Sequence, residues 1–325
     1  MFKQDAPFSL QIELTEGCNL YCKFCGIRGI RKRAGDYKFM TISTAKEIVN
    51  KLKATDWNSR IEFAMHGEPT LNPDMMKIIR IFRKVIPTCQ MMLLTNGITL
   101  SKSIGKINKM FDSGLNIIGI DDYGTRAVSK LKNKYKGFQY PYPDKNMSPH
   151  MRVKSTDKLL IYIGDIRENK RGGHSTIVNH CGAARPMLKV PIMKRCAKPF
   201  RELSIRWDGN IALCCNDFRG QFKIANIHDF DSIEDIWNCK RFQSARRFLY
   251  DANRCFFPCS ICDATSYRVG LLPDKQGKKS MKSPSKKDSE IVRKAIEGEA
   301  YCGIIKRSWE INPKKSLKSF FNNED

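Results

Sequence analysis

The stretch EGCNLYCKFCG, residues 16–26, places three cysteines, Cys18, Cys22 and Cys25, within eight positions of the chain. It follows directly on FSLQIEL (8–14), which has the apolar content of a strand. Zinc sites and ordinary iron–sulfur sites usually take four protein ligands. Three thiolates without a fourth therefore indicate a metal centre with one position left open for chemistry, such as a four-iron cluster in which one iron has no protein ligand.

Strand and helix patterns alternate from residue 8 to residue 164. Strands are predicted at 8–14, 60–67, 90–97, 115–123 and 158–164, and helices at 41–52, 74–86 and 103–114. This alternation predicts an α/β fold with a parallel sheet, open or curled into a barrel. Chemistry in such folds gathers at the carboxyl ends of the strands. The cysteines, HGEPT (66–70) and TNG (95–97) all follow strands, so we expect them on one rim.

These motifs resemble those of the radical S-adenosylmethionine (SAM) superfamily. In that family an aromatic residue before the third cysteine lies against the adenine, and a Gly-Gly-Glu-Pro motif binds the SAM amino group. This chain departs from the second motif, because His66 replaces the first glycine. The positions that the resemblance assigns to SAM binding are Phe24, Gly67, Glu68, Pro69 and Asn96.

The resemblance implies a partial (β/α)6 barrel over roughly residues 8–180. It also implies that Cys18, Cys22 and Cys25 hold a [4Fe-4S] cluster at which SAM is reduced. The sulfonium bond then breaks, and the 5′-deoxyadenosyl radical abstracts hydrogen from a substrate. An external one-electron reductant of the flavodoxin or ferredoxin type is the implied partner.

A second set of cysteines follows in the C-terminal half. RELSIRWDGNIALCC (201–215) has the pattern of a hairpin that turns at Asp208-Gly209-Asn210, and a helical segment over 232–248 leads to CFFPCSIC (255–262). The hairpin is expected to bring Cys214 close to Cys196, and the closing C-x2-C returns after the helix. Four thiolates would then enclose a metal centre without a vacancy, either an iron–sulfur cluster or a zinc ribbon.

This order of cysteines resembles the SPASM and twitch domains of radical SAM enzymes, which carry auxiliary iron–sulfur clusters, and is closer to the shorter twitch form. The resemblance implies a second [4Fe-4S] cluster held by Cys196, Cys214, Cys259 and Cys262. Two adjacent cysteines could substitute in this assignment, Cys215 and Cys255. The others are interpreted as ordinary buried thiols: Cys89, Cys181, Cys239 and Cys302.

Three parts are predicted: a radical SAM core over 1–180 with a basic insert at about 123–154, an auxiliary cluster domain over 181–265, and a basic, partly disordered extension over 266–325. Thirteen cysteines without a secretory signal favour metal or redox chemistry in the cytoplasm over a disulfide framework. No apolar run approaches the ~20 residues of a membrane span, so no membrane partner is expected.

The substrate is not readable from these motifs. The net charge of +25, the cations of IRGIRKR (27–33), the insert with its eight Lys/Arg and the Gly-rich KRGGHS (170–175) suit a polyanion such as nucleic acid, or only a solvated surface. Oxidation of a small or peptidyl substrate is favoured. The alternatives are the same chemistry on a nucleic-acid base and a non-catalytic zinc-bearing nucleic-acid binder. Candidates for a general base are His66, Asp121, Asp122, His174 and His180.

Overall fold

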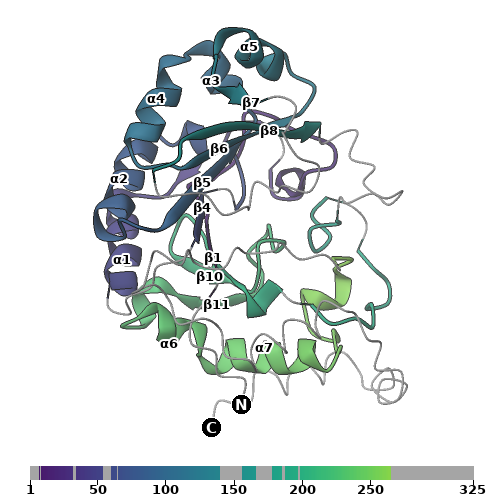
Figure 1. The fold of residues 1–325 in the computed structure, drawn as a ribbon. Helices are drawn as coiled ribbons and strands as arrows, with labels where there is room; N and C mark the ends of the chain where they lie inside the picture. Colours follow the sequence, from purple (N-terminus) through teal and green to yellow (C-terminus); the bar gives the residue numbers. More distant parts are fainter. Residues whose placement is uncertain are drawn as a thin grey trace.

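One sheet of nine strands forms the centre of the protein, as the computed structural model shows (Figure 1). The structure describes residues 7, 9–31, 34–53, 60–63, 65–139, 156–165, 178–184, 187–196 and 198–264. The strand order is β11-β10-β9-β1-β4-β5-β6-β8-β7, and every pair from β9 to β7 is parallel. The nine strands are β1 (Ser9–Ile12), β4 (Arg60–Phe63), β5 (Gln90–Thr95), β6 (Ile117–Asp122), β7 (Phe138–Gln139), β8 (Leu159–Asp165), β9 (Glu202–Ile205), β10 (Asn210–Ala212) and β11 (Lys223–Asn226).

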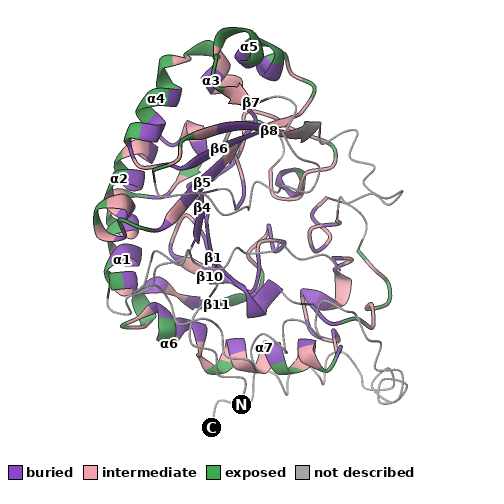
Figure 2. Ribbon diagram, viewed as in Figure 1, coloured by how far each residue is buried: buried purple, intermediate pink, exposed green. Residues whose placement is uncertain are grey.

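Helices cover one face of this sheet, with their outer surfaces exposed (Figure 2). Helix α1 buries Ala45, Ile48, Val49 and Leu52, the i, i+3, i+4, i+7 spacing of a single helical face. Thr41 caps its start, since the Thr44 N–H donates to the Thr41 hydroxyl at 3.1 Å. The helices before the second cysteine set are α1 (Ile42–Lys53), α2 (Met75–Val85), α3 (Ile98–Lys102), α4 (Gly105–Asp112) and α5 (Ala127–Lys134).

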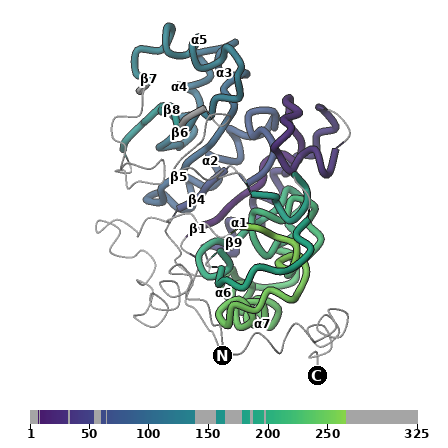
Figure 3. The backbone as a smooth tube through the Cα atoms, turned by 90° about the vertical axis from the view of Figure 1, so that its right-hand side faces the viewer, coloured from purple at the N-terminus to yellow at the C-terminus, as the bar shows by residue number. Residues whose placement is uncertain are grey.

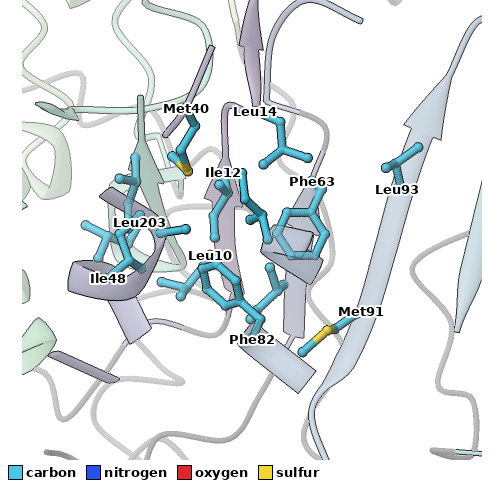
Figure 4. Close-up of a cluster of buried hydrophobic side chains, with 14 of the residues drawn as sticks. Leu10, Ile12, Leu14, Met40, Ile48, Phe63, Phe82, Met91, Leu93 and Leu203 are labelled. Carbon is cyan, nitrogen blue, oxygen red and sulfur yellow. The ribbon is translucent and has the colours of Figure 1, made fainter. Parts of the chain in front are cut away.

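The two faces of β1 have different side chains. Leu10 and Ile12 point into an apolar layer with Phe63 and Phe82, between the sheet and helices α1 and α2 (Figure 4). The alternate residues Ser9, Gln11 and Glu13 are polar yet fully buried. Because side chains alternate along a strand, this polar row lies on the opposite face of the sheet from the helices. At β1 the sheet thus has an apolar side toward the helices and a polar side away from them, whereas β5, β6 and β8 carry an apolar cluster with Met92, Ile117 and Ile161.

The C-terminal hairpin extends the same sheet. Strand β9 pairs parallel to β1, with Ser9 opposite Glu202 and Ile12 opposite Ile205, while β10 and β11 continue antiparallel. Gly209 makes the predicted turn with a φ of 81°. Figure 3 shows the resulting arrangement, in which β9 lies beside β1 and is followed along the chain by α6 (Ile233–Trp237) and α7 (Lys240–Tyr250). The second cysteine set is therefore attached to the strand that leads into the first.

The α/β architecture with its parallel sheet is confirmed, and three details differ from the prediction. The segment 103–114 is preceded by a separate short helix, α3. The helix expected over 232–248 is two helices, α6 (Ile233–Trp237) and α7 (Lys240–Tyr250), and the insert contributes α5 and β7. Within the described residues, no helix is long and apolar enough to cross a membrane. The rest of the insert, His174 and the C-terminal extension lie outside the described residues.

Candidate functional site

The first three cysteines lie in a loop at the carboxyl end of β1. Strand β2 (Thr15–Glu16) pairs with β3 (Lys38–Phe39) and closes the base of this loop. None of the three thiols is in a disulfide, all are half-buried, and they are close enough to interact electrostatically. Burial raises the pKa of the Cys18 thiol to about 12 and that of Cys25 to about 11. Since iron stabilises the thiolate, this donor set suits a bound cluster.

The HGEPT segment packs tightly under this loop. The Glu68 N–H donates to the Gly17 carbonyl at 3.0 Å, so the residue before Cys18 is fixed to the end of β4. Gly67 has a φ of +64°, and a Cβ there would lie 2.0 Å from the Thr15 carbonyl oxygen and 2.5 Å from that of Gly17. Only glycine fits this position.

We expect Gly67→Ala to destabilise the protein by about 2–5 kcal/mol, from overpacking of about 1–3 kcal/mol and a left-handed alanine of about 1–2 kcal/mol. Loss of SAM binding should accompany it. The control is Gly105→Ala at the start of α4, where nothing lies within 4 Å of the added Cβ. The thermal unfolding midpoint and equilibrium binding of SAM measure both variants. Equal behaviour of the two would contradict this role of Gly67.

The Glu68 carboxylate joins the ends of β4 and β5. Its Oε1 accepts from the Thr70 N–H (3.1 Å), the Thr70 hydroxyl (2.6 Å) and the Thr95 hydroxyl (2.6 Å), and its Oε2 accepts from the Asn96 N–H (2.9 Å). Burial raises the pKa of Glu68 even though these hydrogen bonds oppose the shift. Oε2 has the capacity for one further donor, such as an ammonium group.

Asn96 connects the end of β5 to the cysteine loop. Its Nδ2 donates to Asn19 Oδ1 at 2.8 Å and lies 3.7 Å from Cys18 Sγ. Its Oδ1 accepts from the Ile98 N–H at 3.0 Å, which fixes the orientation of the amide. The structure thus brings the cysteine loop, Glu68 and Asn96 together on one rim, as the strand-end argument predicts.

Tyr123 belongs to this site and was missed at the level of the sequence. Its ring lies near-parallel to that of Phe24, at an interplanar angle of 12° and a centroid distance of 6.1 Å. Burial raises the pKa of Tyr123, and the nearby Asp121 and Cys25 add to the shift. The available signal was its place directly after β6, the same strand-end rule that identified the other residues.

His66, the departure from the family motif, is buried between the two halves of the site. Its Nδ1 is 2.8 Å from Glu13 Oε1, and its Nε2 is 2.7 Å from the Cys215 carbonyl oxygen. Burial alone would raise the pKa of Glu13, but the His66 ring and Arg206 outweigh it and lower that pKa. Both ring nitrogens of His66 thus face oxygen atoms, one of a carboxyl group and one of a backbone carbonyl, and the ring connects these two segments.

We expect His66→Gly, which restores the family residue, to destabilise the protein by about 3 kcal/mol. It removes one partner of a buried ion pair, and the value is at the lower end for such losses because Arg206 still faces Glu13. The thermal unfolding midpoint of the anaerobic protein should fall by about 6 °C or more. The control is His228→Gly at an exposed position, with a cost of about 1 kcal/mol or less. Equal shifts in both variants would contradict the double hydrogen bond.

The second cysteine set also gathers in space. Cys196 precedes the short helix η4 (Lys198–Phe200), Cys214 follows β10, and Cys259 and Cys262 flank the last short helix, η6 (Cys259–Ile261). All four side chains are buried. Burial raises the pKa of Cys214 and of Cys259, and the nearby Cys196 and Cys262 add to both shifts. The set therefore offers four free, buried thiols near one another, the number of ligands that a four-iron cluster with no open iron takes.

Arg254 hydrogen-bonds to the backbone at both ends of the segment that carries these four cysteines. Its guanidinium donates to the carbonyl oxygens of Lys194 (2.7 Å), Arg195 (3.0 Å) and Ala264 (2.8 Å). These carbonyls lie just before Cys196 and just after Cys262. The planar fork of an arginine is suited to such a multiple contact.

The remaining cysteines have different surroundings. Cys89 is buried in the main core, as predicted for an ordinary thiol. Cys215 points toward Lys198, with 3.1 Å between Sγ and Nζ. Cys239 lies at the start of α7. Cys181 differs from its interpretation as an ordinary buried thiol, because it hydrogen-bonds to Cys262 and lies beside Cys214 and Cys259.

The described candidates for a general base have different surroundings. Asp122 Oδ1 accepts from the Gly124 N–H at 2.8 Å and so stabilises a turn. The His180 ring packs on Phe218 at 4.6 Å between centroids. Asp121 lies at the end of β6, where the register with β8 shifts, and interacts with Tyr123. A bulge of this kind re-aims side chains beside a site. Among the described candidates, Asp121 is the one that interacts with Tyr123 of the aromatic pair.

The two described cations that follow the third cysteine, Arg28 and Arg31, have partners inside the protein. Arg28 stacks on the Tyr21 ring at 4.8 Å, and Arg31 pairs with Glu16. These two cations stabilise the cysteine loop. The expectation of a polyanionic partner stays a prediction, because residues 140–154 of the insert, the Gly-rich segment 170–175 and the extension lie outside the described residues.

Comparisons with known proteins assign the two cysteine-bearing segments to two families. Residues 12–121 match the family model of the radical SAM superfamily, and residues 196–263 match the SPASM iron–sulfur cluster-binding domain. The chain is 24% identical over 255 residues to the SAM-dependent 2-deoxy-scyllo-inosamine dehydrogenase of Niallia circulans, covering 77% of this chain and 90% of that protein. It is 27% identical over 134 residues to the GTP 3′,8-cyclase of Photorhabdus laumondii, covering 41% and 39%.

A solved structure shares the fold. The crystal structure of BtrN in complex with AdoMet and 2-DOIA superposes with a TM-score of 0.61 at 19% identity, over 81% of this chain and 96% of BtrN. An open form of BtrN gives a TM-score of 0.56 over 82% and 95%. The arrangement of a partial barrel followed by a hairpin and helices is therefore common to both proteins.

Proposed function

We propose that this protein, a radical SAM enzyme with a C-terminal SPASM domain, dehydrogenates a hydroxyl-bearing small or peptidyl substrate. The observation that supports this most is the pair of thiol sets, a half-buried triplet on the barrel rim and a buried quartet attached to the same sheet. The similarity to an inosamine dehydrogenase over most of both chains points to the same class of reaction.

We assign Cys18, Cys22 and Cys25 to the SAM-binding cluster and Cys196, Cys214, Cys259 and Cys262 to the auxiliary cluster. When bound, these groups supply one-electron reduction of SAM, with a 5′-deoxyadenosyl radical as the hydrogen abstractor, and a one-electron acceptor for the substrate. The oxidation then balances as one hydrogen atom to the nucleoside, one electron to the acceptor and one proton to a base.

The residues of this chain orient and enclose the reactants. The Glu68 carboxylate is held by Thr70, Thr95 and Asn96, and its Oε2 would accept a hydrogen bond from the SAM amino group. Phe24 and Tyr123 supply an apolar wall beside the triplet that excludes water. Asp121, at the end of β6, is the group we assign to receive the substrate proton.

An external donor must deliver electrons to the first cluster. We propose a cytoplasmic flavodoxin or ferredoxin for this role, since both are one-electron carriers that dock transiently. Purified protein with SAM should form 5′-deoxyadenosine with a reduced carrier of either kind, and none with SAM alone.

The experiment that tests the reaction uses anaerobically reconstituted protein, SAM, a chemical reductant and a panel of aminocyclitols, amino sugars and serine-containing peptides. A true substrate should yield a carbonyl product with two hydrogen atoms fewer than the substrate. Deuterium placed on the carbinol carbon of the substrate should appear in 5′-deoxyadenosine. The matched control is the deoxy analogue of the same compound, which should give no such product. Transfer of deuterium without formation of a carbonyl would contradict dehydrogenation.

A further inference from the structure

Cys181 is a buried thiol that the assigned clusters do not use. It is 3% exposed and packs in one group with Cys262, Ala264 and Val178. It lies before residue 196, where the match to the SPASM family model begins. Its thiol hydrogen-bonds to Cys262. The second site thus contains a fifth thiol beside the four assigned ligands.

The chain reaches this position through an unusual backbone conformation. His180, Cys181 and Gly182 have consecutive φ angles of 48°, 52° and 78°. Two of these residues carry a Cβ, for which the left-handed region is unfavourable. Such a conformation persists only where the surrounding structure holds it.

Hydrogen bonds of Asn179 help to hold this backbone conformation. The Asn179 N–H donates to Asp263 Oδ1 at 2.7 Å, and in return the Asp263 N–H donates to Asn179 Oδ1 at 3.3 Å. The Asn179 amide also donates to the Ile261 carbonyl at 2.8 Å. The residue two before Cys181 is therefore tied to the residues on both sides of Cys262. This fixes the two thiols relative to each other.

Cys262 is the assigned ligand that accepts the most hydrogen bonds among those described. The Ala264 N–H donates to Cys262 Sγ at 3.4 Å, and the thiol and the backbone N–H of Cys181 are further donors. Two thiolates bound to different irons of one cubane point outward from separate corners, so they stand further apart than a hydrogen bond allows. A thiol that keeps this contact with Cys262 beside a bound cluster acts as a donor to that ligand and not as a further ligand.

We propose that Cys181 is a non-ligating, positioning thiol that donates a hydrogen bond to the Cys262 sulfur and raises the reduction potential of the auxiliary cluster. Hydrogen bonds to cluster sulfurs stabilise the more negative, reduced state. A higher potential makes the cluster a better acceptor for the electron of a substrate radical. The inference rests on the proposed assignment of Cys196, Cys214, Cys259 and Cys262 as the auxiliary ligands.

The test isolates the auxiliary cluster in full-length protein in which Cys18, Cys22 and Cys25 are all replaced by alanine. Cys181→Ala and Cys181→Ser are each added to this background, and Cys239→Ser serves as the control for removal of a distant cysteine. Iron content and an EPR-monitored redox titration are measured for every variant. All should retain about four irons per chain.

Cys181→Ala should lower the equilibrium constant for reduction about tenfold, which is about 59 mV for a one-electron couple. Cys181→Ser keeps an O–H donor and should recover most of this shift, while Cys239→Ser should leave the potential unchanged. An unchanged potential in Cys181→Ala would overturn the proposal. Loss of the cluster from that variant would also overturn it, by showing that Cys181 is a ligand.

The failure of the proposed function gives a different result. If the background protein without the first three cysteines binds no iron at all, the auxiliary ligand assignment is wrong before Cys181 is changed. If the background protein holds about four irons and the Cys181 variants have the same reduction potential as that background, the auxiliary cluster assignment stands and only the hydrogen-bond role of Cys181 is contradicted.

Discussion

Cys22→Ala should abolish cleavage of SAM, leaving only the background rate seen without enzyme. With one of three thiolates missing, the first cluster loses the ligand set that leaves a single iron open for SAM. Iron should fall from about eight to about four per chain, because the auxiliary set is a separate group of residues. Iron analysis and 5′-deoxyadenosine formation under anaerobic reducing conditions measure these two effects.

The matched control for Cys22→Ala is Cys239→Ser. Cys239 is half-buried at the start of α7, where serine is a favourable N-cap residue. We expect this variant to keep about eight irons and the full rate of SAM cleavage. Retention of SAM cleavage by Cys22→Ala, with iron unchanged, would remove the triplet from the mechanism.

Cys259→Ala should separate the two halves of the reaction. The first cluster and its SAM site share no residue with the assigned auxiliary ligands, so 5′-deoxyadenosine should still form. The oxidised product should be lost, because the substrate radical has no acceptor for its electron. The measurement is the ratio of oxidised product to 5′-deoxyadenosine, which should fall toward zero while iron falls to about four per chain.

Cys255→Ala is the control for this variant, since Cys255 lies in the same segment, four residues earlier. It should keep both the product ratio and about eight irons, because Cys255 is half-buried while the four assigned thiols are buried together. Full product formation by Cys259→Ala would contradict the role of the auxiliary cluster as electron acceptor. Loss of iron in Cys255→Ala would instead move the assignment to that neighbour.

Much of the fold could be predicted because its signals are local. The buried spacing of α1 and α2 and the apolar runs of β1, β5 and β6 are readable from adjacent residues. The strand-end rule then placed Cys18, Glu68 and Asn96 on one rim without any knowledge of distances. The hairpin turn at Gly209 followed from its turn residues.

The features that escaped prediction depend on contacts between distant segments. Pairing of β9 with β1 joins residues about 190 apart, and no local pattern specifies it. The Cys181–Cys262 contact and the His66 bridge between Glu13 and Cys215 have the same origin. A lone histidine or cysteine has no periodicity, so its partners become visible only when the tertiary structure is known.

The two thiol sets are physically connected through His66. The residue that precedes the Gly67-Glu68 segment holds the carbonyl of Cys215, which directly follows the assigned auxiliary ligand Cys214. The His66 ring also packs on Phe218 at 4.0 Å between centroids, and Gly26, next to Cys25, lies against the same Phe218 ring. The electron transfer that we propose requires a fixed spacing between the two sets.

Hyperfine spectroscopy of the reduced first cluster, with SAM labelled by nitrogen-15 in its amino group, tests most directly whether the thiol triplet leaves one iron open for SAM. The account predicts a coupling from that nitrogen to the cluster in the wild-type protein, and its loss in Cys18→Ala, Cys22→Ala or Cys25→Ala. A reconstituted protein in which the cluster shows no coupling to labelled SAM, or which holds zinc in place of iron, would contradict it.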